Sequence, residues 1–590
     1  MADLSSGTIT HPAADDLPRS CLVQHDTTQK MRDDTAEQDH PKPLPEGECV
    51  CPVVPLDRLC PQCRTIEFDT MANTTDSYTH EDENFFRGEA TQDVNNNRVI
   101  SNTMFEMNAM RGLEDFHLFQ VCYGDYKSYS RQYPRKIIVI PSHKGPGFFG
   151  RHIDRDAVDL GAVCTQLQFC EKNHELCKPV HSASTASKYR DLGLRAIDVD
   201  SMTVVPIMWE NDRYVALSYV WGSTHTNEED RDCELPSRLP QVVQDAVVVT
   251  KSLGHRFLWV DRYCIPQTDM VARQQQIQAM GEIYLHSSLT ITAAAGMDAD
   301  YGLPGISTRR SKQDSIRVGQ HCLLAFYPPI HELPTTKWAS RGWTYQEGLL
   351  STRRLIFTQS RVFFECREAL FDEYCTAFNV EPSDAHWSSS YKDLFHAFRS
   401  FVPDREDEGE FFRQAAMRIG EFSQRELTYD GDALNAMAGV LSLYPDIAFC
   451  GLPVPRLLPV GCRLDRETDS LTLALAWTGS DQPGSTRRHA FPSWTWAGWK
   501  KCVYQGPTEP HPKYYFKFLV DTISVQFKDT AVDWEAGKRD IMARSRAGTL
   551  PMWLQISGWS FTSLEDPESQ VEHCIIARDS SVAQTAVQTS

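Results

Sequence analysis

The chain has 590 residues, of which 41% are hydrophobic and 10% aromatic, so it can bury about three or four cores and is not disordered as a whole. Its 59 basic and 79 acidic residues give a formal net charge of −20 at pH 7 without a basic patch, which argues against binding to nucleic acid or an anionic membrane. The 18 cysteines are spread irregularly, no signal peptide is evident, and no apolar run approaches the ~18 residues of a membrane span. We therefore expect a cytoplasmic protein whose thiols are mostly reduced.

Residues 1–90 are rich in Asp, Thr, Pro, Asn and Gln and lack periodicity, so we expect them to be disordered. Four cysteines interrupt this composition: Cys49, Cys51, Cys60 and Cys63. Their CxC and CxxC spacing could bring four thiolates to one zinc ion, but a reduced, Pro-rich loop without metal explains the same residues.

Residues 91–210 mix strand and helix patterns, and we expect an α+β segment there, with a strand at Lys136–Ile140 and a helix at Val158–Cys177. This helix ends in a group of candidate metal ligands, because Cys170 and His174 are four residues apart and Cys177 follows three later. With Cys164 or His181 as a fourth ligand, the spacing fits a metal site. Buried cysteines that pack as small apolar side chains explain it equally, so the sequence leaves metal binding open.

A regular alternation of strands and helices begins at Tyr214. The apolar runs Tyr214–Val220, Phe257–Val260 and Leu289–Ala294 are typical of central strands in a parallel sheet. Amphipathic helices are predicted between them: the first ends at Gly254, and the second begins near Met270. This order predicts an α/β fold with a parallel sheet, right-handed crossovers and flanking helices, within a larger α+β chain.

The candidate site follows from this sheet, because ligands of open parallel sheets bind beyond the carboxyl ends of the strands. The segments Ser218–Gly222 and Asp261–Gln267 lie at two such ends. We therefore expect a site where these two segments meet.

Helical patterns take over from about residue 369, most clearly at Ala433–Leu443. Trp- and Phe-rich runs around 471–499 and 515–560 favour strands or packing loops. We expect a helical and Trp-rich region at 369–500, a β-rich segment at 501–575 and a disordered tail at 576–590.

Four successive blocks resemble those of the fungal heterokaryon-incompatibility (HET) domain: Tyr214–Gly222, Leu258–Gln267, Gln276–Tyr284 and Ser340–Glu347. The resemblance covers residues 211–368, about a quarter of the chain, and the flanking segments Cys170–Cys177, Leu427–Gly439 and Phe491–Trp499 resemble those found beside this domain. It implies an effector of fungal non-self recognition that triggers programmed cell death when genetically different hyphae fuse. Ala272 stands where family members often carry an acidic residue, so no role for that carboxylate can be carried over.

The HET domain is thought to be similar to TIR domains, some of which cleave NAD. Leu217–Tyr219 with Trp221 and Gly222 resembles the first TIR strand, and Trp343-x3-Glu347 has the spacing of the TIR segment that carries the catalytic Glu. The resemblance implies a TIR-like, flavodoxin-like fold and an NAD hydrolase without a cofactor, in which Glu347 is the catalytic carboxylate. The residues expected to bind the substrate NAD are Ser218, Tyr219, Trp221, Gly222, Asp261, Arg341 and Trp343.

This chemistry needs few groups, because a carboxylate beside the ribose stabilises the oxocarbenium character while nicotinamide leaves as a neutral base. Trp221 or Trp343 would stack on a planar ring, and Arg341 would contact a phosphate. Alternatively, Glu347 has a structural role, in which it accepts hydrogen bonds from backbone N–H groups or forms an ion pair with Arg341 or Arg353. The Trp side chains are equally explained as core fillers, and Asp261 as the cap of a turn.

Two further alternatives stay open. A cysteine hydrolase with Cys264 as nucleophile needs a His base, and His255, His286 and His321 form no convincing pattern with it. The other is a non-enzymatic module that signals by self-association or by docking an incompatibility partner protein. The absence of glycine-rich phosphate motifs argues against a nucleotide-driven switch.

Overall fold

The computed structural model describes most of residues 150–374 and 408–577, with gaps between elements, and earlier in the chain only four short strands. The Cys49–Cys63 group therefore lies outside the described residues, and of the predicted disordered region 1–90 only one strand is described. The chain divides into two compact units. The first comprises residues 1–152, 312–327 and 374–386, and the second comprises residues 153–311, 328–373 and 387–590.

The first unit contains a six-stranded antiparallel sheet in the order β1-β2-β3-β4-β11-β10. Strand β4 confirms the strand predicted at 136–140, and its Ile138 pairs with Leu118 on one side and Leu324 on the other. The strands are β1 (Phe85–Arg87), β2 (Met104–Glu106), β3 (Leu118–Cys122), β4 (Arg135–Ile140), β10 (Ser315–Val318) and β11 (His321–Phe326).

The second unit is built on an eight-stranded sheet in the order β14-β13-β12-β9-β7-β8-β5-β6. Its four central strands are parallel: β12 (Arg353–Phe357), β9 (Leu289–Ala293), β7 (Tyr214–Ser218) and β8 (Phe257–Trp259). The three strands predicted in this segment are confirmed. Every residue of β7, β9 and β12 is buried, as expected for strands covered on both faces.

Antiparallel strands extend this sheet at both edges, so the prediction of a parallel sheet holds only for its centre. Both additions are hairpins, which need only a short turn, whereas each parallel step needs a crossover. One hairpin joins β13 (Val362–Cys366) to β14 (Leu370–Asp372), and the other joins β5 (Arg195–Asp198) to β6 (Thr203–Pro206).

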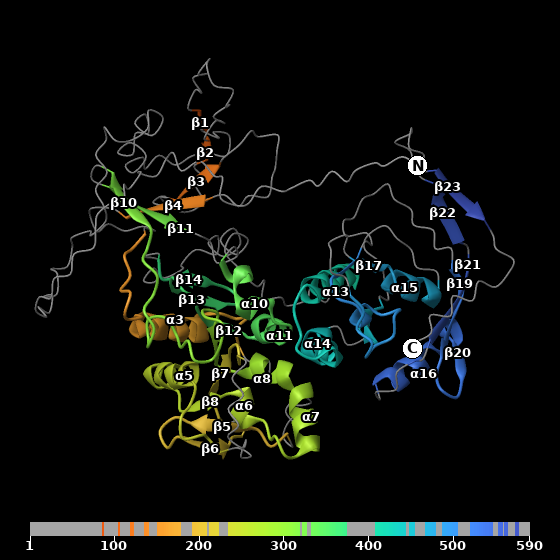
Figure 1. Ribbon diagram of the computed structural model, residues 1–590, viewed down its shortest axis with the longest axis horizontal. Helices are drawn as coiled ribbons and strands as arrows, with labels where there is room; N and C mark the ends of the chain where they lie inside the picture. Colours follow the sequence, from red (N-terminus) through yellow and green to blue (C-terminus); the bar gives the residue numbers. More distant parts are fainter. Residues whose placement is uncertain are drawn as a thin grey trace, which may run out of the picture. The chain divides into compact units, whose positions relative to one another are not determined.

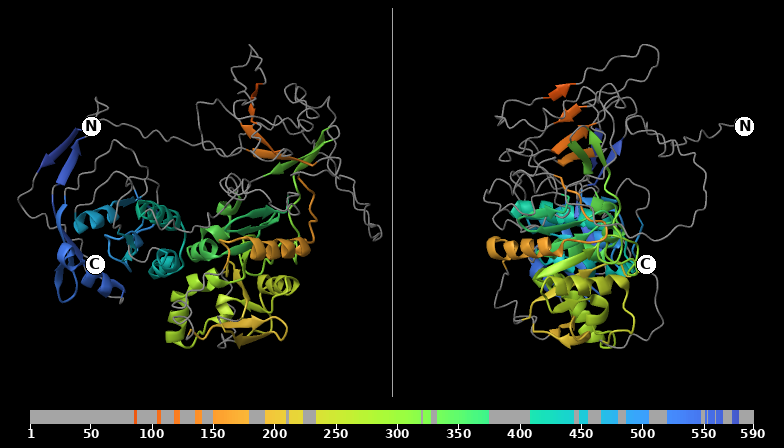
Figure 2. Two further views of the ribbon diagram at one scale, coloured as in Figure 1. Left: turned by 180° about the vertical axis from the view of Figure 1, so that it is seen from behind. Right: turned by 90° about the vertical axis from the view of Figure 1, so that its left-hand side faces the viewer.

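Helices cover both faces of the sheet: α3 (Leu160–Asn173) and α5 (Gln241–Ser252) lie to one side, and α8 (Met280–His286) and α11 (Trp343–Leu350) to the other (Figures 1 and 2). Helix α5 buries a stripe that includes Val242, Ala246 and Val249, and the chain then turns at Gly254, whose φ of +78° favours glycine. The helix predicted from Met270 is interrupted at Ala279, which separates α7 (Met270–Gln278) from α8. Short turns complete this region: α6 (Asp261–Cys264), η3 (Leu333–Thr335) and α10 (Lys337–Ser340).

The C-terminal part of the second unit is helical at first and richer in strands later. Its aromatic residues form part of the core: Phe449 stacks on Trp494 and packs against Trp534. The helices are α13 (Glu408–Ser423), η5 (Asp430–Asp432), α14 (Asn435–Leu441), α15 (Glu467–Ala474), η6 (Trp496–Gly498) and α16 (Trp534–Arg546). The strands are β15 (Ala448–Phe449), β16 (Leu452–Pro453), β17 (Trp477–Gly479), β18 (Cys502–Tyr504), β19 (Val520–Gln526), β20 (Ala531–Asp533), β21 (Trp553–Gly558), β22 (Ser560–Leu564) and β23 (His573–Ala577). Among the described residues, no helix has the length and apolar character that a membrane crossing requires.

Candidate functional site

The carboxyl end of β7 carries the centre of the candidate site. Ser218 is the last residue of this strand and is fully buried. Its Oγ donates a hydrogen bond of 2.5 Å to Oε2 of Glu347 and accepts one of 2.7 Å from Nε1 of Trp338. A single hydroxyl thus connects β7 with both α10, which carries Trp338, and α11, which carries Glu347.

Glu347 reaches Ser218 because two helices meet at a tight turn. Thr336 caps the N-terminus of α10, because its Oγ1 accepts a hydrogen bond from the backbone N–H of Ala339. At Gly342 a Cβ atom would lie only 2.4 Å from the Leu427 side chain, so only glycine fits there without displacing Leu427. Helix α11 lies next to β7 (Figure 1), and Glu347 is in its second turn.

Asp261 lies at the neighbouring strand end, two residues after the last residue of β8, and is the first residue of α6. Both of its carboxylate oxygens accept from Nε1 of Trp221, at 3.2 and 3.0 Å, and Oδ1 also accepts from the backbone N–H of Arg262 at 2.7 Å. The chain passes from Trp221 through Gly222, where φ is +83° and a Cβ atom would lie 2.7 Å from Cβ of Asp298. Gly222 therefore has a steric role in the turn that brings Trp221 over Asp261.

Arg341 and Tyr219 complete the group at this rim. The guanidinium of Arg341 donates to the backbone carbonyl of Tyr219 at 2.8 Å. The Tyr219 hydroxyl is buried and has no hydrogen-bond partner within the described part of the chain. A buried polar atom without a partner costs free energy, so this hydroxyl is free to bind a polar group that enters the site.

The pKa values of Glu347 and Asp261 both lie above their ordinary range. Burial, with the Asp261 charge as the second cause, raises the pKa of Glu347 to about 7, against the opposing effects of Ser218 and Arg341. Burial likewise raises the pKa of Asp261 to about 6, although its hydrogen bonds favour the charged form. Buried carboxylates with raised pKa values are typical of catalytic sites, and also of structural networks.

The cluster is covered rather than open. Glu347 is 4% exposed and Ser218 and Trp338 are fully buried, whereas Trp221 at the rim is 37% exposed. A surface hollow of about 540 Å³ lies elsewhere in this unit, between α3 and the turn that leads from α5 into β8, and none of the predicted site residues lines it. A ligand would therefore reach Glu347 only after the cover around Trp221 and Asp261 moves.

The structure brings together most of the residues predicted for the site. Trp343 has a different neighbour, because its Nε1 donates to Oδ2 of Asp432 at 3.3 Å. Glu347 is paired with Ser218 rather than with Arg353, whose guanidinium donates to the Cys170 sulfur. The residues joined at the strand ends are Ser218, Tyr219, Trp221, Gly222, Asp261, Arg341 and Glu347.

The sequence did not identify Trp338 and Tyr284 as members of the site. The Tyr284 hydroxyl donates to the carbonyl of Leu217 at 3.1 Å and also interacts with Glu347. Its helical spacing predicted only a core position, which it also has. Cys264, the alternative nucleophile, is fully buried, and its sulfur accepts from the backbone N–H of Val260 at 3.3 Å.

Comparison with known proteins identifies one family. Residues 214–347 match the family described as Heterokaryon incompatibility protein (HET). The matched segment begins with β7 and ends at Glu347, so it contains every predicted site residue. No curated protein and no solved structure matches the chain.

Proposed function

From the premise that residues 214–347 form a HET domain, which supports a role in heterokaryon incompatibility, we propose that this protein triggers programmed cell death in fungal non-self recognition. We propose further that it does so by hydrolysing NAD at the covered cluster of Ser218, Asp261 and Glu347. The observation that carries this proposal is the convergence of these three residues, from three separate segments, at the carboxyl ends of β7 and β8.

The order of the parallel strands supports a TIR-like, flavodoxin-like domain. Numbered along the chain, β7, β8, β9 and β12 lie in the order 2-1-3-4, which is that of flavodoxin-like sheets. In such sheets the connections that follow the first and the third strand run toward opposite sides, which opens a ligand site beside the carboxyl end of the first strand. Ser218 lies at that end of β7.

NAD hydrolysis requires one negative charge close to C1′ of the ribose. Water replaces nicotinamide at C1′ of the ribose, so one C–N bond breaks, one C–O bond forms and a proton is released. The ionised Glu347 would stabilise the oxocarbenium character at C1′, because a carboxylate in a site of low polarity interacts strongly with developing positive charge. Arg341 would attract a phosphate, and the unpaired Tyr219 hydroxyl would donate to a ligand oxygen.

The cover over Glu347 suits an effector that has to be inactive until it is triggered. Trp221 is the most exposed member of the site, and its indole is hydrogen-bonded to Asp261. Displacement of this indole would open the side of the cluster that faces solvent. We propose that this displacement activates the domain.

Nicotinamide release by the purified full-length chain tests the enzymatic proposal. The variant Glu347→Gln keeps the shape of the side chain but removes its charge, so turnover should fall by about 100- to 1,000-fold. Glu282→Gln on α8 is the matched control, because it makes the same change in the same domain at a residue paired with His286. Equal turnover in wild type and Glu347→Gln, or no turnover in wild type under conditions where it kills cells, would refute NAD hydrolysis.

A non-enzymatic module is the second candidate, favoured by the near-complete burial of Glu347. On this view its hydrogen bond with Ser218 holds α11 against β7, and the domain signals by self-association or by docking a partner protein. Expression in a fungal cell separates the two candidates. A folded Glu347→Gln variant that still kills while cellular NAD is unchanged supports the module, whereas loss of both killing and NAD depletion supports the enzyme.

A further inference from the structure

Four metal-ligand side chains meet on the same side of the sheet as α3. Cys170, His174 and Cys177 come from α3 and the turn after it, and Cys366 is the last residue of β13. All four are buried, and their ligand atoms lie within 4.8 Å of one another. We propose that these residues, the thiol cluster, bind a structural zinc ion through three cysteine sulfurs and one histidine nitrogen.

The helix end accounts for three of the ligands. Cys170 and His174 face the same way because they are one turn apart, and α3 stops between them at Asn173. The backbone N–H of His174 still bonds to the carbonyl of Cys170, at 3.1 Å, so the last turn keeps its shape while His174 itself becomes extended. The chain then turns back and brings Cys177 to the same point.

The fourth ligand comes from far along the chain. The Cys366 sulfur lies 3.3 Å from Nδ1 of His174, although the two residues are 192 positions apart. Two ligands of one tetrahedral zinc, at about 2.3 Å for sulfur and 2.1 Å for nitrogen, are about 3.6 Å apart. Only a small shift would therefore centre an ion between them, bound through Nδ1 of His174.

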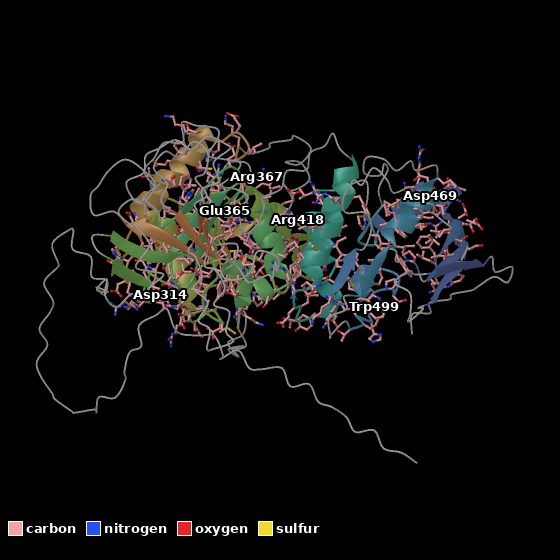
Figure 3. The ribbon with its side chains drawn as sticks, turned by 90° about the horizontal axis from the view of Figure 1, so that it is seen from above. Asp314, Glu365, Arg367, Arg418, Asp469 and Trp499 are labelled. Carbon is pink, nitrogen blue, oxygen red and sulfur yellow. The ribbon has the colours of Figure 1, made fainter. Side chains whose placement is uncertain are left out.

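The β13–β14 turn is shaped to present a thiolate. The backbone N–H of Ala369 donates to the Cys366 sulfur at 3.2 Å, and the backbone N–H of Cys366 donates to the carbonyl of Ala369 at 2.8 Å. Backbone N–H groups aimed at sulfur stabilise negative charge on it, as outer contacts do around bound metals. Figure 3 labels Glu365 and Arg367, which precede and follow Cys366 in the sequence at the end of β13.

A buried arginine supplies independent evidence that the cluster is anionic. Arg353 is 6% exposed, and its guanidinium donates to the Cys170 sulfur at 3.1 Å and to the carbonyls of Cys177 and Ser288. Among the described residues it forms no ion pair with a carboxylate, although a buried charge needs a counter-charge. Zinc with three thiolates carries a net charge of −1, which provides that counter-charge.

The proposed site is closed, because four protein ligands leave no coordination position for substrate. Its role is to clamp α3, which precedes the matched HET segment, onto β13, which follows it. The folded domain thus extends beyond residues 214–347 in both directions.

The test is the metal content of the full-length chain, purified under reducing conditions and measured by elemental mass spectrometry. Cys366→Ser and His174→Ala should each lower the zinc content by about one ion per chain. Cys164→Ser is the matched control, because Cys164 lies on α3 but only accepts from its neighbour Gln168, so the zinc content should not change. The differences remain informative even if the Cys49–Cys63 group holds a zinc ion of its own.

Replacement of zinc by cobalt distinguishes the loss of a metal ligand from a failure of the variant to fold. Wild type and Cys164→Ser should show the visible absorption of tetrahedral cobalt bound to thiolates, and the all-cysteine site made by His174→Cys should retain it with a shifted spectrum. Equal zinc content in wild type and a folded Cys366→Ser variant would overturn the proposal. So would a disulfide between any two of the three cysteines in the purified protein.

Discussion

The second unit buries two polar clusters, one on each face of the same sheet. The two clusters differ in how the charge of their buried groups is accommodated. In the carboxylate cluster of Ser218, Asp261 and Glu347, burial raises the pKa values of the two acids until they titrate near neutral pH. In the thiol cluster, the proposed cation would hold three thiolates charged and fixed. The first arrangement can respond to protonation or to a ligand, whereas the second can only hold the fold together. The contrast suggests that the domain combines a rigid edge at β13 with an adjustable centre at β7.

Removal of zinc should produce the largest change in stability. A bound ion at 1,000 times its dissociation constant stabilises the folded state by about 4 kcal/mol, and chelation removes this contribution. Because the chain has two units, the appropriate measurement is local hydrogen exchange in α3 and β13, which should accelerate on chelation and recover when zinc is returned. Unchanged exchange in both segments would reduce the thiol cluster to ordinary core cysteines and remove the contrast.

The pH dependence of stability should reveal the strain in the carboxylate cluster. The pKa of Glu347 is about 7 in the folded protein against 4.5 for the ordinary side chain, so the folded state binds more protons between these values. Stability should therefore fall as pH rises from about 5 to 8, by about 2.5 kcal/mol from this group alone. Asp261, with a pKa raised to about 6, acts in the same direction.

Comparison of thermal unfolding in wild type and Glu347→Gln isolates this effect. The variant has no carboxylate to titrate, so its stability should exceed that of wild type by more at pH 8 than at pH 5. Glu282→Gln should follow the wild-type curve. If the stabilities of wild type and Glu347→Gln changed with pH in parallel, ionisation of Glu347 would not destabilise the folded protein. The carboxylate cluster would then be no more strained than the proposed zinc site.

The strands and helices of the matched segment were predictable because their signals are local. The apolar run at Tyr214–Ser218 and the stripe on α5 with its terminal Gly254 each follow from a few neighbouring residues. The meeting of Ser218 and Asp261 also followed, since parallel strands end at one edge of a sheet. The antiparallel edge strands were not predicted, because short hairpins lack the repeated alternation that marked the centre.

Contacts between side chains that are far apart in the sequence could not be predicted from the sequence. Cys366 joins His174 over 192 positions, and only the register of β13 beside β12 places it there. Trp338 and Tyr284 contact the carboxylate cluster because of the rotation of their helices, which periodicity fixes only to a face. Trp343 illustrates the converse, since a spacing that matches a known segment did not determine that its indole would bond to Asp432.

Ser218→Ala should have the smallest effect of the changes considered, and it addresses the carboxylate cluster most directly. The Ser218 hydroxyl donates to Glu347 and accepts from Trp338, so its removal deletes one hydrogen bond from each of two buried groups and should cost about 1–3 kcal/mol. It should also raise the pKa of Glu347 further, because the hydrogen bond from Ser218 favours the charged form. Ser252→Ala on the exposed side of α5 makes the same chemical change and should cost less than about 0.5 kcal/mol. If both variants unfold at the same temperature, the Ser218 hydroxyl does not hold α11 to β7, and Glu347 is free to move as an enzyme would require.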